Sequence, residues 1–120
     1  MSKPARQGVI IYSNNTEDLA AFYESVFAMD IIKTSKQWVT LECEGLHIVV
    51  HVPPQQFPPE RMNTIKLFIS VDSHHDAHQS VTEAGGKSLP GEWANPLFSV
   101  SNIADPEGNI VQLRVFAASE

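Results

Sequence analysis

This chain contains an internal repeat. Residues 44–52 (EGLHIVVHV) align without a gap with residues 107–115 (EGNIVQLRV). Each copy is a short apolar stretch behind a Glu-Gly turn, as is typical of a β-strand that follows a tight turn. The alignment pairs His47 with Ile110, Val49 with Gln112 and His51 with Arg114. We therefore expect two similar halves within one chain.

The first half has the pattern of a strand, a helix and three further strands. GVIIYS (8–13) is short and β-branched, and Asn15 or Thr16 can cap the helix that follows it. The side chains expected to form one apolar face of that helix are Leu19, Phe22, Tyr23, Val26 and Phe27. The three strands are expected at DIIKTS (30–35), QWVTLEC (37–43) and LHIVVHV (46–52).

The second half repeats this order. IKLFISV (65–71) is a strand, and Asp72 or Ser73 can cap the next helix. The weaker apolar face of this helix is formed by Ala77, His78, Val81 and Ala84. Pro90 and Gly91 interrupt KSLPGEW (87–93), which makes it a poor strand and leaves Trp93 in a loop. The last two strands are expected at LFSVSNIA (97–104) and NIVQLRVF (109–116).

The two halves are separated by a proline-rich segment without periodicity, PPQQFPPERMN (53–63). We predict one α+β domain over residues 1–120, with a first βαβββ module at about 7–53 and a second at about 64–117. The linker is placed at about 54–63. A chain of 120 residues suffices for one core, whereas two independent domains of half that length would be marginal. An unrelated α+β domain with an accidental repeat is the alternative.

The composition argues against two classes of partner. The net charge is −6 and the eight basic residues are scattered, which disfavours nucleic-acid binding because phosphate contacts need clustered Lys and Arg. No apolar run approaches the roughly 18 residues of a membrane span, and no hydrophobic segment follows the basic N-terminus. Cys43 is the single cysteine and suits a reducing compartment. We expect a cytoplasmic protein that binds neither nucleic acid nor membrane.

Three stretches of the chain resemble the vicinal oxygen chelate superfamily, which includes glyoxalase I, extradiol dioxygenases and bleomycin-resistance proteins. They are GVIIYSNNTEDLAAFYESVFAMD (8–30), VDSHHDAHQSVTEAGG (71–86) and DPEGNIVQLRV (105–115), and the last is the most specific. The resemblance implies two βαβββ modules that form a curled mixed sheet around a cleft, with the helices on the outer face. It also implies a divalent metal in that cleft and a homodimer, in some members with halves exchanged.

The superfamily's metal-ligand positions fall on residues that bind metals poorly. The resemblance places them at Gly8, Val49, Gln112 and Lys66, or at Thr64 instead of Lys66 if the register slips by two. Glycine and valine offer no donor, and an ammonium group repels a cation. Gln112 alone cannot supply the three or so protein ligands of a catalytic zinc site. We therefore predict no metal and no cofactor.

Strand alternation assigns the faces of the two sheets. Val9, Ile11, Leu67, Ile69 and Val71 are expected to pack under the helices, and Val39, Leu41 and Cys43 to lie in the core. Thr40 and Glu42 are expected to face the cleft. We predict that an organic ligand contacts Tyr12, Trp38, His47, Lys66, Phe68, Trp93, Gln112 and Arg114.

Several of these residues have a second interpretation. Lys66 and Arg114 favour an anionic ligand group, but Glu42 could instead neutralise one of them. His47 is either an acid–base group or an ordinary strand residue, and His51 is expected to be the latter. Trp93 either flanks the cleft or packs over an open end of the sheet. His74 and His78 share a helix face and could bind a stray metal ion, but His74 and His75 are expected to face solvent at a helix start and His78 to pack on the apolar face.

The function that fits these expectations is a metal-free small-molecule binding protein, with ligand contacts that are aromatic, apolar and basic. One alternative is a divalent-metal-dependent lyase, isomerase or dioxygenase that uses Gln112 with further ligands not located in the sequence. The other is a degenerate domain with a structural or regulatory role. Whether the protein is an enzyme stays open at this point.

Overall fold

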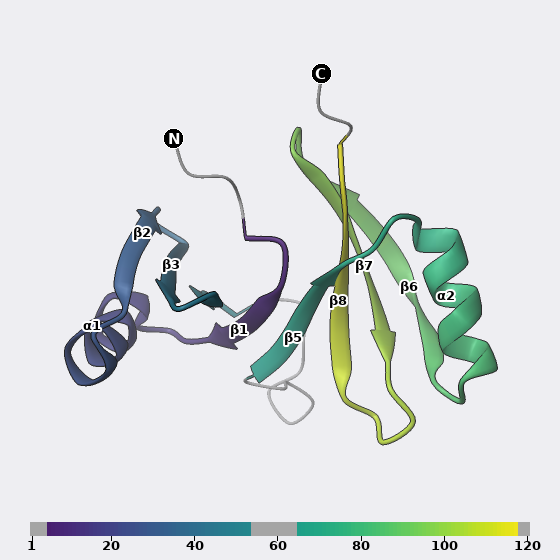
Figure 1. The fold of residues 1–120 in the computed structure, drawn as a ribbon, viewed down its shortest axis with the longest axis horizontal. Helices are drawn as coiled ribbons and strands as arrows, with labels where there is room; N and C mark the ends of the chain where they lie inside the picture. The colour runs from purple at the N-terminus through teal and green to yellow at the C-terminus, as the bar shows by residue number, and fades with distance from the viewer. Residues whose placement is uncertain (1–4, 54–64, 118–120) are drawn as a thin grey trace. The chain divides into compact units, whose positions relative to one another are not determined.

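The computed structural model describes residues 5–53 and 65–117, which fall into two compact units divided between Ile65 and Lys66. Each unit contains one strand, one helix and three strands in that order, so the predicted α+β class and the two βαβββ modules are confirmed (Figure 1). The predicted linker at 54–63 and Thr64 lie outside the described residues. Within the described ranges, no helix is long and apolar enough to cross a membrane.

The first module is a four-stranded mixed sheet with one helix. Its elements are β1 (Gly8–Tyr12), α1 (Thr16–Phe27), β2 (Asp30–Thr34), β3 (Trp38–Cys43) and β4 (Leu46–His51). The strand order is β2-β3-β4-β1, in which β1 and β4 are parallel and the other pairs are antiparallel. Glu44 and Gly45 join β3 to β4 with φ values of 50° and 90°. Two positive φ angles are what a tight two-residue hairpin turn requires, and glycine supplies one of them without strain.

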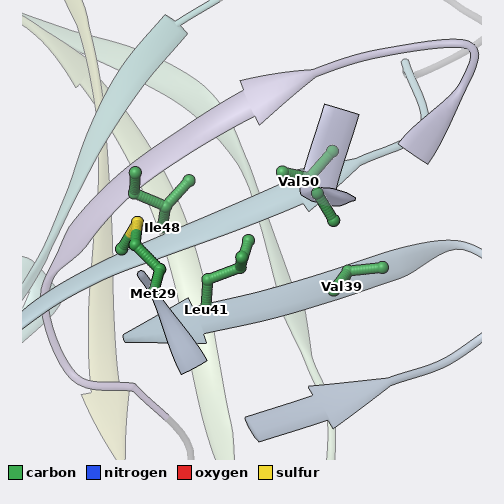
Figure 2. Packing of buried hydrophobic residues seen from close by; sticks show 6 residues of the cluster. Met29, Val39, Leu41, Ile48 and Val50 are labelled. Carbon is green, nitrogen blue, oxygen red and sulfur yellow. The ribbon is translucent and has the colours of Figure 1, made fainter. Parts of the chain in front are cut away.

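The core of the first module lies between α1 and one face of its sheet. The Asn15 side chain caps α1 by accepting a hydrogen bond from the backbone N–H of Asp18 at 3.4 Å, as the sequence predicts. The buried residues of this core are Ala20, Met29, Val39, Leu41, Ile48 and Val50, most of which are labelled in Figure 2. Ile11 and Cys43 pack against them. The predicted strand parity is therefore correct in this module.

The expected apolar face of α1 is only partly buried. Leu19 and Tyr23 pack against the core. Phe22, Val26 and Phe27 are instead 51%, 55% and 56% exposed, so the expectation of one continuous buried face is wrong. The aromatic rings of this helix contact one another instead, with Phe22 and Tyr23 edge-to-face and their centroids 5.2 Å apart. The apolar stripe of α1 is wider than the part of the helix that contacts the sheet, so the side chains at its edge stay exposed.

The second module has the same connections. Its elements are β5 (Ile65–Ser70), α2 (His74–Glu83), β6 (Lys87–Ala94), β7 (Phe98–Ala104) and β8 (Ile110–Phe116). The strand order is β5-β8-β7-β6, in which β5 and β8 are parallel and the others antiparallel. Each position in this order corresponds to one in the first module, which confirms the repeat detected in the sequence. Ser73 caps α2 through a hydrogen bond from the backbone N–H of Asp76 at 3.1 Å.

The segment 87–93 forms part of a continuous strand, contrary to expectation. The register between β6 and β7 shifts between Ser88 and Glu92, where Pro90 and Gly91 lie. Gly91 has φ of 102°. A local bulge of this kind accommodates a proline, which has no N–H to donate, and lets the strand resume beyond it. Trp93 consequently belongs to a strand and not to a loop.

The core of the second module lies between α2 and the sheet. The helix covers fewer strands of the sheet than predicted. Ile103, Val111 and Leu113 are buried, and Val71, Ala77 and Val81 pack against them. The helix lies over β6, β7 and β8, as Figure 1 shows for β6. Leu67 and Ile69 on β5 were expected under it but are 49% and 38% exposed. The direction in which α2 crosses the sheet decides which strand stays uncovered, and the sequence does not specify that direction.

Candidate functional site

One face of the second module gathers most of the predicted ligand-binding residues. Phe68 on β5 and Asn102 on β7 are both register partners of Gln112 on β8. Register partners project to the same side of a sheet, so these three side chains share a face. Arg114, two positions further along β8, projects to that face as well. The helix lies on the opposite face, where Val111 and Leu113 point.

Arg114 is the centre of this group. Its side chain is 8% exposed, and Phe68 beside it is 0% exposed. The Arg114 Cζ atom lies 3.9 Å from the centroid of the Phe68 ring and 4.6 Å from that of Phe98. Its Nε donates a hydrogen bond to Gln112 Oε1 at 2.9 Å. The guanidinium is therefore fixed by two aromatic rings and an amide, which favours one orientation of its planar donors.

Two further polar groups accompany Arg114. Burial lowers the pKa of Lys66, and the positive charge of Arg114 lowers it further. Asn102 Oδ1 is buried and lacks a hydrogen-bond donor among the described residues. A buried acceptor without a donor costs free energy, so this oxygen favours a bound group that can donate. The face thus combines cations with an acceptor that is not satisfied.

Trp93 lies beside the same face. It is the register partner of Val100, which in turn pairs with Arg114, so the indole projects to the Arg114 side of the sheet. The side chain is 52% exposed. Its six-membered ring folds back over Gly91, and a Cβ added to Gly91 would lie 2.7 Å from it. The strand, not a loop, therefore positions Trp93.

The first module presents an aromatic cluster formed by Tyr12, Trp38 and His51. Tyr12 on β1 and Trp38 on β3 are both register partners of His51 on β4. The Trp38 and His51 rings stack with centroids 6.2 Å apart and an interplanar angle of 11°. Tyr12 meets His51 edge-on at 6.3 Å. The structure thus brings two of the predicted site residues together through a histidine that was expected to be ordinary.

His51 is a functional candidate of the first module that was not among the predicted ligand contacts, and Asn102 and Phe98 are such candidates in the second module. Its Nδ1 lies 2.8 Å from the Val52 carbonyl oxygen, which can only accept, so Nδ1 carries a proton. In the neutral ring Nε2 then holds the lone pair, the form that a general base or a hydrogen-bond acceptor requires. The signal was present in the sequence, because strand pairing places residue 51 beside residues 12 and 38. The sequence alone does not specify the register of that pairing.

His47 and Glu42 lie at the other end of this face. They are register partners, and both are half-buried. The Glu42 Oε2 atom accepts a hydrogen bond from the backbone N–H of Gly45 at 2.9 Å, so this carboxylate supports its own hairpin turn. That contact gives Glu42 a role within the first module. His47 is held apart from the aromatic cluster, four residues before His51 on the strand.

The residues at the superfamily's metal-ligand positions do not fit a metal ion. Gly8 has no room for a side chain, because an added Cβ would lie 2.2 Å from the carbonyl oxygen of His47. Val49 is apolar, and Lys66 would repel a cation. The Gln112 Oε1 atom already accepts from Arg114. Over the described ranges, no group of three or more His, Cys, Asp or Glu side chains could hold an ion.

Comparisons with known proteins give no match from sequence and clear matches from structure. No family model matches the chain, and no curated protein matches it significantly. A glyoxalase/bleomycin resistance protein/dioxygenase superfamily member from Vibrio splendidus 12B01 is similar, with a TM-score of 0.67 and 13% identity over 93% of this chain and 98% of that one. A methylmalonyl-CoA epimerase from Mycobacterium tuberculosis gives 0.64 and 12% over 98% and 93%.

A third similar structure has a different description. It is an NAD-dependent benzaldehyde dehydrogenase from Legionella pneumophila, with a TM-score of 0.71 and 14% identity over 92% of this chain and 99% of that one. These three descriptions name different activities, and at such low identity the likeness extends to the fold alone. The resemblance seen in the sequence is thus confirmed at that level: the chain has the glyoxalase-like fold of the vicinal oxygen chelate superfamily.

Proposed function

We propose that this protein is a metal-free small-molecule binding protein of the cytoplasm. The single observation that carries the proposal is the hydrogen bond from Arg114 Nε to Gln112 Oε1. The amide oxygen that stands at a metal-ligand position of the superfamily is engaged with a cation of the protein itself. A second cation, Lys66, lies near enough to Arg114 for the two charges to interact. The two cations favour an organic anion at a position where the superfamily would hold a metal ion.

The ligand class follows from the groups on this face. Two cations favour a carboxylate or another anionic group, and an added negative charge offsets both effects that lower the pKa of Lys66. Asn102 Oδ1 favours a hydroxyl or N–H donor on the same ligand. Phe68, Phe98 and Trp93 supply aromatic surface for the ligand's apolar part. An aromatic or aliphatic carboxylic acid with a hydrogen-bond donor has all of these features.

We also propose ligand contacts within the first module, considered by itself. Tyr12 and Trp38 offer aromatic surface, and His51 offers the lone pair of Nε2 to a donor on a ligand. His47 is retained as a polar contact. We also retain the homodimer implied by the resemblance as a prediction, to be measured by analytical ultracentrifugation of the full chain.

The binding test is a thermal-shift screen with carboxylates and their neutral amides. We expect saturable stabilisation by at least one acid, such as benzoate or a hydroxybenzoate, and none by the matching amide. A ligand at 100 times its Kd stabilises the folded state by about 2.7 kcal/mol. Lys66→Met is expected to weaken the effect, whereas Lys36→Met, which removes an exposed lysine in the turn before β3, is the matched control. Equal shifts with acids and amides, or no shift with any acid, would contradict the proposal.

The competing metalloenzyme is tested by metal analysis. Protein purified without a His tag should contain no zinc, nickel, manganese or iron in stoichiometric amount. A stoichiometric ion that is lost in Gln112→Ala, with the fold intact by circular dichroism, would establish the metal-dependent alternative. Such a result would overturn the reading of Gln112 as a partner of Arg114.

A further inference from the structure

The two histidines on the inner side of α2 form a hydrogen-bonded chain with three serines. His74 Nδ1 and His78 Nε2 each lie 2.7 Å from the same atom, Ser101 Oγ. The other nitrogen of His74 lies 2.9 Å from Ser99 Oγ, and that of His78 meets Ser88 Oγ. The expectation that His74 faces solvent is therefore wrong. The five side chains run in the order Ser88, His78, Ser101, His74, Ser99.

The hydrogen bonds of these five side chains contribute much of what holds α2 on the sheet. None of the residues of α2, all of which the structure describes, is fully buried. The apolar contribution to the core comes from Ala77 and Val81, which are partly buried. His74 and His78 lie one turn apart, and each bonds to serines of β6 or β7. The docking of α2 therefore depends on polar contacts more than is usual for a helix on a sheet.

The donors and acceptors of the five side chains determine how many protons the hydrogen-bonded chain can take up. A neutral imidazole has one donor and one acceptor, and each hydroxyl has one donor. With both rings neutral, all four hydrogen bonds are satisfied when the donors point in one direction along the chain, from Ser88 to Ser99 or the reverse. With one ring protonated, that ring donates at both nitrogens, and the Ser101 hydroxyl donates to the other ring. All four bonds are again satisfied.

A second proton breaks this arrangement. Both rings would then donate to Ser101 Oγ, and the hydroxyl would have no imidazole lone pair to donate to. Ser101 is 1% exposed, and none of the described residues offers its hydroxyl another acceptor. The two cations would also lie with ring centroids only 6.5 Å apart. A buried donor without an acceptor and two adjacent like charges both disfavour the folded arrangement.

We propose that Ser88, His78, Ser101, His74 and Ser99 form a one-proton site that controls the docking of α2. The site accepts a first proton without loss of a hydrogen bond, and it releases the helix from the sheet on taking up a second. This role is independent of the ligand site, because Ser99 and Ser101 project to the opposite face of β7 from Asn102. The test of this protonation site is therefore independent of the test of ligand binding.

The charged groups around the site decide where the first proton goes. On β6, Glu92 is the register partner of Ser101 and faces the site, where its charge favours proton uptake. Lys87 pairs with Ala104 and projects to the other face. The residues of β7 and β8 on this side, Ser99, Ser101, Ile103, Val111, Leu113 and Val115, do not ionise as cations or carboxylates.

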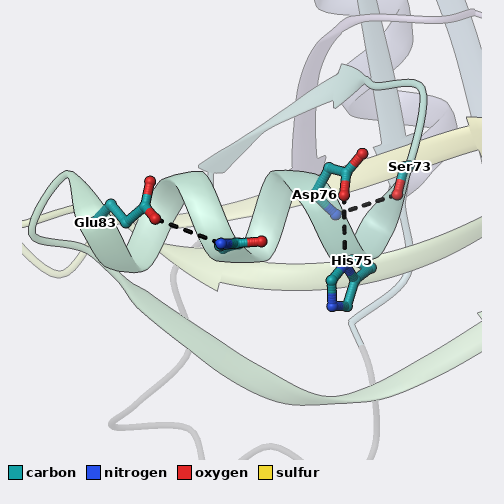
Figure 3. Close-up of polar contacts among 5 residues, drawn as sticks. Ser73, His75, Asp76 and Glu83 are labelled. Carbon is teal, nitrogen blue, oxygen red and sulfur yellow. Dashed lines mark hydrogen bonds and ion pairs between the residues drawn. The ribbon is translucent and has the colours of Figure 1, made fainter.

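On α2 itself the remaining charges lie on its outer surface. His75 and Asp76 form a pair at 3.3 Å whose side chains are 87% and 82% exposed, and Glu83 accepts a hydrogen bond from Gln79 (Figure 3). His74 is the first residue of the helix, where the aligned peptide dipoles disfavour a cation. His78 lies one turn further along and is the expected site of the first proton.

The test uses imidazole nitrogen NMR of the full chain between about pH 8 and 5, the range in which histidines change charge. We expect His78 to take up a proton while α2 amides stay protected from hydrogen exchange, and His74 to stay neutral with its proton on Nε2. Uptake of the second proton is expected to coincide with loss of that protection. His75 lies outside the hydrogen-bonded chain, with its side chain 87% exposed, and serves as the internal control. Two protons on the pair with α2 still protected would overturn the proposal.

Two serine variants separate the coupling from simple stability. Ser101→Ala removes the shared hydroxyl without adding bulk, so the protonation of one ring should no longer set the tautomer of the other. Ser99→Ala removes only the terminal serine of the hydrogen-bonded chain and should leave the coupling between the two rings intact. If Ser101→Ala keeps the linked tautomer change, the bridge is not the coupling element and the proposal fails. Melting curves show whether each variant is folded at the pH of measurement.

Discussion

Arg114 and Gln112 are joined by a hydrogen bond of 2.9 Å between Arg114 Nε and Gln112 Oε1, two residues apart on one face of β8. The resemblance implies a metal ligand at position 112, and in this structure the amide oxygen there accepts from a cation of the protein. The amide fixes the direction of a buried guanidinium, and the guanidinium in turn holds the amide oxygen. Each side chain thereby restricts the rotamers of the other.

Gln112→Glu is predicted to strengthen this contact and not to create a metal site. The new carboxylate would form a charge-assisted hydrogen bond with Arg114, which we expect to stabilise the protein by about 1 kcal/mol. Its charge should also raise the pKa of Lys66. Urea unfolding and calorimetric titration with zinc measure the two outcomes. Tight stoichiometric zinc binding by the variant would show that Arg114 does not hold this position.

Lys66→Met is predicted to stabilise the protein at neutral pH. Because the pKa of Lys66 is lowered in the folded state, the unfolded chain binds more protons between the folded and unfolded pKa values. Wild-type stability therefore rises with pH through that window, and the penalty is fully present below the folded pKa. We expect the variant to gain less than about 1 kcal/mol at neutral pH, because partial exposure screens the charge. Its stability curve should lack this alkaline rise, whereas Lys36→Met should retain it.

Gly8→Ala is predicted to destabilise the first module by about 1–3 kcal/mol, the usual cost of forcing bulk into a packed position. The added Cβ would lie 2.2 Å from the backbone oxygen of His47, which cannot rotate away as a side chain could. Gly45→Ala is the comparison, since nothing lies within 4 Å of its Cβ and only its positive φ resists the change. Urea unfolding of both variants should show the larger loss at Gly8. A smaller loss at Gly8 would mean that β1 and β4 can separate readily.

Asp105→Asn is predicted to remove an acid-sensitive component of stability. Hydrogen bonds from the Asn109 side chain, and then from backbone N–H groups, lower the pKa of the Asp105 carboxyl. This carboxylate stabilises the turn before β8 above its unfolded pKa, and the contribution is lost as pH falls through the folded pKa. Unfolding midpoints across an acid pH series should fall less steeply in the variant. Glu107→Gln removes the same charge from the same turn and should behave as wild type.

Phe22→Ser is predicted to change stability by less than about 1 kcal/mol, despite its place in an apolar helical pattern. The side chain is 51% exposed and touches mainly its aromatic neighbours on α1. Leu41→Ala, at a residue that is 0% exposed, should cost about 2–5 kcal/mol. Chemical unfolding of the two variants compares them directly. A loss at Phe22 as large as that at Leu41 would mean that this surface is covered in solution.

The strand faces could be predicted from the sequence because alternation along a strand is strict. The assignment of Val39 and Leu41 to the core of the first module, and of Phe68, Gln112 and Arg114 to the face of the second sheet away from its helix, needed only parity and the repeat. What parity cannot give is the line along which a helix crosses its sheet. That line leaves Phe22 and Leu67 exposed and brings His78 over the serines of β7.

Strand alternation predicts which residues share a face, but not the contacts that those residues make. Tyr12 and Trp38 were placed correctly on one face, but their meeting through His51 required the pairing register of three strands. The stacking of Arg114 on Phe68 likewise depends on side-chain conformations that no spacing in the sequence encodes. The bulge at Pro90 and Gly91 was predicted as an interruption of the strand, because proline and glycine are typical of loops as well as of bulged strands.

The close approach of Gly8 to the His47 carbonyl also limits which sequences this chain can reach by single substitutions. A histidine at position 8, the first ligand of a superfamily metal site, would collide with the neighbouring strand before it could meet an ion. The backbone of β4 would therefore have to move before any substitution at position 8 could supply a metal ligand. A path of single substitutions toward such a site has a fixed order of steps, and its first step adds no ligand.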